Sequence, residues 1–406
     1  MPQPFSLFRA ARGLLALAGL LSGTLVQADS GADTGSDRLE AVVVEAVQPL
    51  VEKYRIPGMA LALTIDGEPH FFTLGETALE DGVPVTEHTL FEVGSISKTF
   101  TATLAAYAEV KGALDFHKPV SAYLPPLRGS AMDRVSVLNL ATHTAGYFPL
   151  QVPEEIADDT QLLAYFRNWQ PQYTPGTKRT YSNPGSGLLG LVAARSLNQP
   201  FAKVMEEQIF RGLGLSDTYV RVPEKKMHDY AEGHNSQHKP VRVNIGLLGN
   251  EAYGVRSTAA DLTRFLAAQM ELVKVSDDLQ KALAKTRTGY FETDYYVQDM
   301  VWEQYALPLS QARLLAGNSR DMITRDQPVG AVGPLSPQRD VLINKTGSTG
   351  GFSAYVAFIP QQRFGFVLLA NKYFPNKERV ELLYKILQAL LPDATANSNT
   401  SDTSES

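Results

Sequence analysis

The chain has 406 residues, of which 44% are hydrophobic and 20% charged, and its formal net charge at pH 7 is −6. This length and balance suit one large or two medium domains with a real core, and mild acidity without a basic stripe argues against nucleic acid as a partner. Cysteine is absent, which excludes disulfides, thiol nucleophiles and cysteine-ligated zinc.

The first 28 residues have the parts of an export signal. Arg9 and Arg12 precede an apolar run from Gly13 to Leu25, and the segment ends in Val26-Gln27-Ala28. The apolar run is too short to span a bilayer as a mature helix, and small side chains near Ala28 suit a signal peptidase. We therefore expect cleavage after Ala28 and a periplasmic mature protein with no attachment to the membrane.

The two ends of the chain carry mirrored patterns. Apolar residues recur at helical spacing over 38–54, and two strand-like runs over 58–75 are joined at Asp66-Gly67. Two further strand-like runs cover 353–370, and helical spacing returns over 377–391. These patterns predict an α+β fold, in which one antiparallel sheet is flanked by the N- and C-terminal helices.

The middle of the chain, about 91–324, is mostly helical in pattern, with connections rich in proline and glycine. We interpret it as a large lobe inserted into an α/β lobe made of about 38–90 and 325–392, the whole forming one unit over 29–392. A cleft between two lobes is a natural place for a site. The polar tail over 393–406 should be disordered.

Ser95 and Lys98 stand one helical turn apart in the stretch FEVGSISKTF. The residues that follow predict a helix, and free N–H groups at its start would favour negative charge near Ser95. A lysine one turn on can lower the pKa of the hydroxyl, or act as a base where burial depresses its own pKa. The alternative is a plain helix-capping serine with a solvated lysine, because chance supplies roughly two such motifs in a chain this long.

Two more motifs occur once each in the chain: Tyr181 with Asn183, and Lys345-Thr346-Gly347 at the start of a strand-like run. A strand with lysine and threonine beside glycine lets a substrate lie along its edge while the ammonium meets a carboxylate. Each motif alone could be structural, as a half-buried aromatic, a helix cap or a solvated strand end. All three in this order are much harder to obtain by accident.

These motifs and their surroundings resemble the class C, or cephalosporinase-type, serine β-lactamases. The resemblance covers about 38–391 and is carried by LFEVGSISKTFTATL, LATHTAGYFPLQVP, YSNPGSGLLG, NEAYGVRST, NKTGSTGGFSAYVAFIP and LLANKYFPNKERV. It implies the β-lactamase/transpeptidase-like fold and hydrolysis of the β-lactam amide of cephalosporins and penicillins through an acyl-enzyme, conferring antibiotic resistance. It implies small-molecule β-lactams as partners and no cofactor or metal, and we take a monomer as the default.

The resemblance also implies roles for individual residues. Ser95 would be the nucleophile, Tyr181 and Lys98 would move protons, with the base left open, and the backbone N–H groups of Ser95 and Ser348 would form an oxyanion hole. The catalytic set is Ser95, Lys98, Tyr181, Lys345 and Ser348. The substrate-binding set is Gln151, Asn183, Tyr253, Thr346, Gly347, Asn376 and Arg379.

Three positions depart from the family's pattern. His143 and Tyr147 stand where tyrosine and glycine are expected, and Gly249 stands where an acidic residue is common, which leaves the substrate range open. A D-alanyl-D-alanine carboxypeptidase or esterase on the same fold, or a non-hydrolytic muropeptide-binding sensor, is the alternative. The glycines over 185–190 predict tight helix packing rather than a dinucleotide site, and the histidines over 228–238 predict a solvated loop rather than a metal site.

Overall fold

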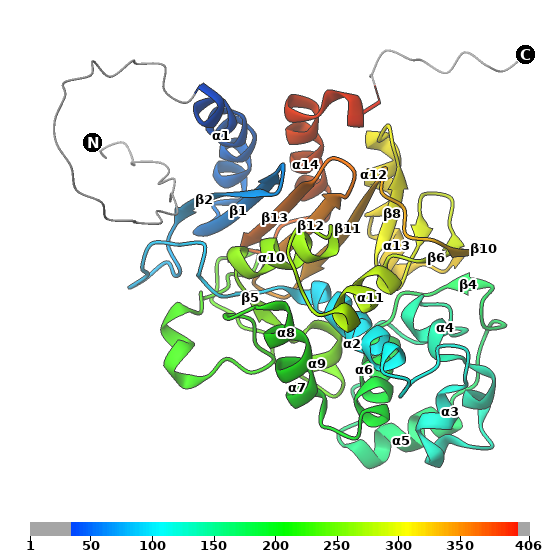
Figure 1. The fold of residues 1–406 in the computed structure, drawn as a ribbon. Coiled ribbons are helices and arrows are strands. Elements are labelled where there is room, and N and C mark those ends of the chain that lie inside the picture. Colours follow the sequence, from blue (N-terminus) through cyan, green and yellow to red (C-terminus); the bar gives the residue numbers. More distant parts are fainter. Residues whose placement is uncertain (1–33, 397–406) are drawn as a thin grey trace, which may run out of the picture.

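The computed structural model describes residues 34–396, and its central feature is a nine-stranded sheet (Figure 1). The strand order is β10-β6-β7-β8-β11-β12-β13-β1-β2. The strands are β1 (Gly58–Ile65), β2 (Glu68–Gly75), β6 (Gly289–Glu292), β7 (Val297–Gln298), β8 (Glu303–Ala306), β10 (Gly330–Leu335), β11 (Val341–Ser348), β12 (Ser353–Ile359) and β13 (Phe364–Ala370). The antiparallel pairing of β1 with β13 joins the two ends of the chain in one sheet, which confirms the predicted α+β architecture.

The turns of the two terminal hairpins explain why the sequence predicts them. Asp66 and Gly67 join β1 to β2 and have φ angles of 52° and 91°. Two consecutive residues with positive φ match the right-handed twist of the flanking strands, and Asp-Gly is a preferred pair for such a turn. Arg363, with a φ of 51°, belongs to the corresponding turn between β12 and β13. Both predicted hairpins are confirmed.

Helices cover both faces of the sheet. Helices α1 (Thr34–Tyr54) and α14 (Asn376–Leu390) contact each other on one face (Figure 1). Side chains alternate along a strand, so that Leu61 of β1 packs with these helices while Ala62 belongs to the core on the other face. The central strands are therefore buried on both faces, which accounts for their nearly continuous apolar runs.

The other face carries the helices of the middle segment. They include α2 (Ser97–Val110), α4 (Val137–Ala141), α5 (Asp159–Asn168), α6 (Asn183–Ser196), α7 (Phe201–Val204), α8 (Arg211–Leu213), α9 (Gly249–Tyr253), α10 (Ala259–Gln269) and α11 (Asp277–Thr286). The predicted lobe boundary near 324 differs from the structure, because β6, β7 and β8 already join the sheet over 289–306. These strands are two to four residues long and too short to show a clear period-2 pattern.

The end of the chain also differs from the prediction. Residues 393–396 are ordered, since Ala394 is buried and its carbonyl oxygen accepts a hydrogen bond from the Leu309 N–H at 2.7 Å. Residues 397–406, and the export signal predicted over 1–28, lie outside the described part of the chain. Between residues 34 and 396, no helix is both long and apolar enough to cross a membrane.

Candidate active site

Ser95 lies on a helical turn, Gly94–Ile96, that leads into α2 and touches the end of β11. Gly94 has a φ of 51°, and a Cβ added there would lie 2.4 Å from the backbone nitrogen of Ser348. A Cβ on Gly347 would lie 2.0 Å from the carbonyl oxygen of Val93. Side chains at either position would separate the two segments, so the glycines bring the backbones of Ser95 and Ser348 together.

Lys98 is completely buried, and its Nζ lies 3.0 Å from Ser95 Oγ. The same nitrogen donates to Asn183 Oδ1 at 2.7 Å and to the carbonyl oxygen of Ala252 at 2.8 Å. Burial lowers the pKa of Lys98, although Tyr181 acts against this effect. An ammonium ion can donate to all three oxygens, whereas a neutral amine can donate to Asn183 and Ala252 and accept the hydroxyl proton of Ser95.

Tyr181 is buried just before α6, and two ammonium groups flank its ring. Lys98 Nζ lies 5.0 Å and Lys345 Nζ 5.3 Å from the ring centroid. Burial opposes ionisation of the phenol, but the charges of Lys98 and Lys345 outweigh it and lower the pKa of Tyr181 to about 8. A phenolate is therefore accessible at mildly alkaline pH.

Glu303 and Arg179 complete the charged cluster and were not identified from the sequence. Glu303 Oε1 lies 3.5 Å from Lys345 Nζ and 3.6 Å from Arg179 Nη2, and all three side chains are buried. Glu303 reaches Lys345 because β8 pairs with β11, placing Glu303 opposite Asn344. A lone glutamate in a four-residue strand carries no local signal that could have revealed this contact.

A cavity of about 170 Å³ opens beside Ser95. It is lined by Ser95, Leu150, Tyr181, Asn183, Ile323, Lys345, Thr346, Gly347, Ser348 and Asn376. All but Leu150 and Ile323 belong to the residues assigned from the sequence, and Lys98 touches Ser95 from within the protein. The structure thus brings the three motifs together around one small cleft.

Three of the expected substrate-binding residues, Gln151, Tyr253 and Arg379, do not line this cavity. Gln151 is exposed, and its neighbour Leu150 takes the place at the cleft. Tyr253 is half-buried, and its hydroxyl oxygen lies 2.9 Å from the position of a Cβ added to Gly249. The absence of a side chain at position 249 therefore allows the ring of Tyr253 to fold back over α9.

Arg379, expected among the substrate-binding residues, lies behind the end of β11 in this structure. Its guanidinium is completely buried and donates to the carbonyl oxygens of Gly347 at 2.6 Å, Ala354 at 2.9 Å and Phe374 at 2.7 Å. It also donates to Ser348 Oγ at 2.8 Å. Arg379 therefore holds the end of β11 in place and contacts the cleft through Ser348.

Two predictions on other motifs can be compared with the structure. The glycines over 185–190 lie in α6, where a Cβ on Gly187 would lie 2.4 Å from Leu248 Cβ and one on Gly190 2.6 Å from Glu251 Cγ, which confirms tight helix packing. Between residues 34 and 396, no group of three or more histidine, aspartate or glutamate side chains is placed to hold a metal ion.

Comparison with known proteins identifies the family. The family model "Beta-lactamase" matches residues 43–391. A beta-lactamase of Providencia stuartii is 45% identical over 349 residues, covering 86% of this chain and 91% of that protein. A beta-lactamase of Pseudomonas fluorescens is 45% identical over 353 residues, covering 87% and 99%.

Solved structures agree with this result. A class C beta-lactamase in complex with cefoxitin is 46% identical, with a TM-score of 0.85 and coverage of 87% of this chain and 99% of that one. A beta-lactamase/D-alanine carboxypeptidase from Pseudomonas syringae is 47% identical, with a TM-score of 0.86 and coverage of 87% and 99%. The sequence match over most of the chain, the shared fold and the cluster around Ser95 together show that the chain belongs to the β-lactamase family, in its class C branch.

Proposed function

We propose that the protein hydrolyses the β-lactam amide of cephalosporins and penicillins through an acyl-enzyme on Ser95. The observation that carries the proposal is the contact of Ser95 Oγ with the Lys98 ammonium, beside a phenol whose pKa is lowered to about 8. Acyl transfer requires a hydroxyl group with a proton acceptor close by and positively charged groups around it.

Acylation begins when Ser95 Oγ attacks the β-lactam carbonyl carbon. The backbone N–H groups of Ser95 and Ser348, adjacent because of Gly94 and Gly347, stabilise the oxyanion that forms, and one such donor is typically worth roughly 3 kcal/mol. The C–N bond of the ring then breaks, and the ring nitrogen receives the proton that left the serine. Water attacks the resulting ester from the side of Tyr181 and releases the product.

We propose Tyr181 as the base, with Lys98 as an ammonium ion. In its charged form Lys98 donates to Ser95, Asn183 and Ala252 and has no lone pair to accept the serine proton. The Tyr181 phenolate, stabilised by Lys98 and Lys345, can take it. Lys98 then serves to lower the pKa of both hydroxyl groups and to hold Asn183.

The substrate's carboxylate would lie at the other end of the cleft. Lys345 supplies the charge, and Thr346 Oγ1 accepts a hydrogen bond from Asn376 Nδ2 at 3.4 Å. The amide side chain of the substrate would lie near Asn183 and Leu150. A cephalosporin carries groups for both ends, and a related class C β-lactamase structure contains cefoxitin.

The test is nitrocefin turnover by the purified mature protein, combined with intact mass spectrometry of the same mixture. We expect many turnovers per protein and their loss in Ser95→Ala without loss of the fold. Lys345→Ala should lower kcat/KM through weaker carboxylate recognition. Continued turnover by Ser95→Ala would refute the nucleophile assignment.

D-alanyl-D-alanine carboxypeptidase activity is the second candidate, because the Pseudomonas syringae relative carries both names. Both reactions use an acyl-serine, and they differ in how fast water reaches it. In the same experiment, a stoichiometric burst that leaves a stable adduct on Ser95, together with release of D-alanine from a D-Ala-D-Ala peptide, would favour the carboxypeptidase.

We also propose that the protein is exported to the periplasm and confers resistance there. The support is the sequence of residues 1–28, with Arg9 and Arg12 before an apolar run that ends near Ala28. N-terminal sequencing of the protein from a periplasmic fraction should begin at Asp29. A host that expresses the chain should tolerate more cephalosporin than one that expresses Ser95→Ala.

A further inference from the structure

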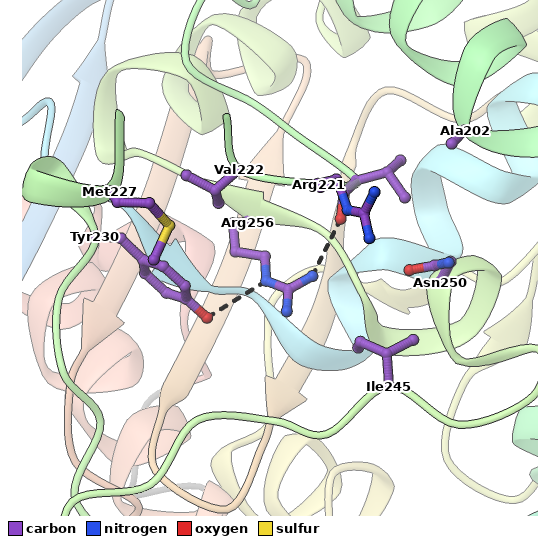
Figure 2. Close-up of a pocket in the computed structure, with 9 residues that line it drawn as sticks. Ala202, Arg221, Val222, Met227, Tyr230, Ile245, Asn250 and Arg256 are labelled. Carbon is purple, nitrogen blue, oxygen red and sulfur yellow. Dashed lines mark hydrogen bonds between the residues drawn. The ribbon is translucent and has the colours of Figure 1, made fainter. Parts of the chain in front are cut away.

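Figure 2 shows a second cavity, of about 630 Å³. Its apolar wall is formed by Val220, Val222, Met227 and Ile245. None of its lining residues is shared with the smaller cavity. Its volume falls within the range of pockets that bind small organic molecules, which are mostly apolar with a few polar groups.

Two arginines give this cavity its charge. Figure 2 shows the Arg256 guanidinium between Tyr230 on one side and Arg221 and Asn250 on the other. Arg256 donates to the carbonyl oxygens of Val220 at 3.1 Å and Gly254 at 2.6 Å, and to the Tyr230 hydroxyl at 3.4 Å. All three acceptors are neutral, so these bonds orient the guanidinium without compensating its charge.

The nearby carboxylates of Glu206 and Glu92 accept hydrogen bonds from neutral donors. Glu206 Oε1 accepts the backbone N–H of Val220 at 3.1 Å, and Glu92 Oε1 accepts the Tyr230 hydroxyl at 2.6 Å. Neither arginine has a carboxylate within 4.0 Å among residues 34–396. The cavity therefore combines an apolar wall with two guanidinium groups that form no direct ion pair, although the buried Glu92 opposite Arg256 offsets part of the charge.

We propose that this cavity is a binding site for an amphipathic carboxylate, with the carboxylate between Arg221 and Arg256 and an apolar tail along Val222, Met227 and Ile245. Guanidinium groups bind carboxylates through paired, charge-assisted hydrogen bonds. The apolar tail is buried from water at the same time, which adds a favourable term proportional to its area. A polar anion would bind without the contribution from apolar burial. A neutral amphiphile would bind without the hydrogen bonds to the guanidinium groups.

The test is calorimetric titration with decanoate below its micelle concentration, with decanol as the uncharged probe of equal chain length. We expect one molecule of decanoate per chain and weaker binding of decanol by about tenfold or more, since hydrogen bonds to charged groups are the stronger class. Arg221→Gln, at an exposed position, should weaken the binding of decanoate by a similar factor. Because calorimetry detects binding and not turnover, the result does not depend on whether β-lactams are substrates.

Two control variants test whether decanoate binds in this cavity. Arg211→Gln removes an exposed arginine of α8 that does not line the cavity, and it should leave decanoate binding unchanged. Leu150→Asp places a charge at the rim of the cleft near Ser95, and it should also have no effect. No saturable heat, equal affinity in Arg221→Gln, or loss of binding in Leu150→Asp would each overturn the proposal, the last by placing decanoate in the cleft.

Discussion

The imidazole of His143 packs against the phenol ring of Tyr181, with ring centroids 4.7 Å apart and an interplanar angle of 39°. His143 is buried and has a φ of 59°, and neither ring nitrogen has a hydrogen-bond partner among the described residues. Burial, followed by the charges of Arg179, Lys98 and Lys345, holds the pKa of His143 well below its usual range. The ring beside the proposed base is therefore a neutral imidazole.

This neutral histidine predicts a loss of stability in acid. Its pKa is lower in the folded than in the unfolded chain, so below about pH 6.5 the unfolded chain binds a proton that the folded chain does not. Stability then falls with decreasing pH, and the effect is absent above that value. Between about pH 7.5 and 5.5 the wild type should lose about 1 kcal/mol more than His143→Phe.

Urea unfolding of both proteins at the two pH values measures this difference. His117→Gln, at an exposed histidine, is the matched control and should lose as much stability as the wild type. An equal loss in all three proteins would mean that His143 does not resist protonation in the folded chain.

The pKa of Tyr181 predicts the pH dependence of catalysis. If the phenolate is the base, kcat/KM for nitrocefin should rise with pH and level off above about 8, the value to which Lys98 and Lys345 lower this pKa. Lys345→Met removes one of these charges, so the phenolate is less stable. The acid limb, the low-pH part of the profile where kcat/KM rises, should therefore move to higher pH. Thr346→Val weakens binding at the same end of the cleft without changing charge, and its acid limb should stay in place.

The hairpins, the terminal helices and the three motifs could be predicted from the sequence because each is a local pattern. Asp66-Gly67 sets its own turn, and Ser95 and Lys98 lie on one stretch of chain. The pairing of Lys345 with Glu303 could not be predicted, because it depends on the register between β11 and a four-residue strand. The burial of Arg379 could not be predicted from the sequence either, since its acceptors are mainly backbone carbonyl groups that the fold brings together.

Removal of the charge on Glu303 should shift the pH profile in the opposite direction to Lys345→Met. In Glu303→Gln the Lys345 and Arg179 cations lose their carboxylate, so their field on Tyr181 grows and the acid limb should move to lower pH. Leaving buried charges unpaired should also cost about 3 kcal/mol of unfolding free energy. The pH profile and urea unfolding measure the two effects, and a limb that moves upward would contradict the assigned charges.

The last prediction concerns Gly249 and the position of Tyr253. A Cβ at residue 249 would lie 2.9 Å from the Tyr253 hydroxyl oxygen, whereas a Cβ at Gly246 would lie 3.9 Å from the same atom, an ordinary contact. Gly249→Ala should therefore displace the Tyr253 ring, while Gly246→Ala should leave it in place, and crystal structures of the two variants would show the difference.

The displaced ring should change selectivity more than the rate on small substrates. If Tyr253 borders the substrate's side chain, Gly249→Ala should alter the ratio of kcat/KM for cephalosporins with large and small side chains by about fivefold or more, equivalent to about 1 kcal/mol, the scale of one lost or gained packing contact. Gly246→Ala should preserve the wild-type ratio. If the ring moves but the ratio stays constant, Tyr253 does not contact the side chain, and the wall of the cleft at that end is formed by Leu150.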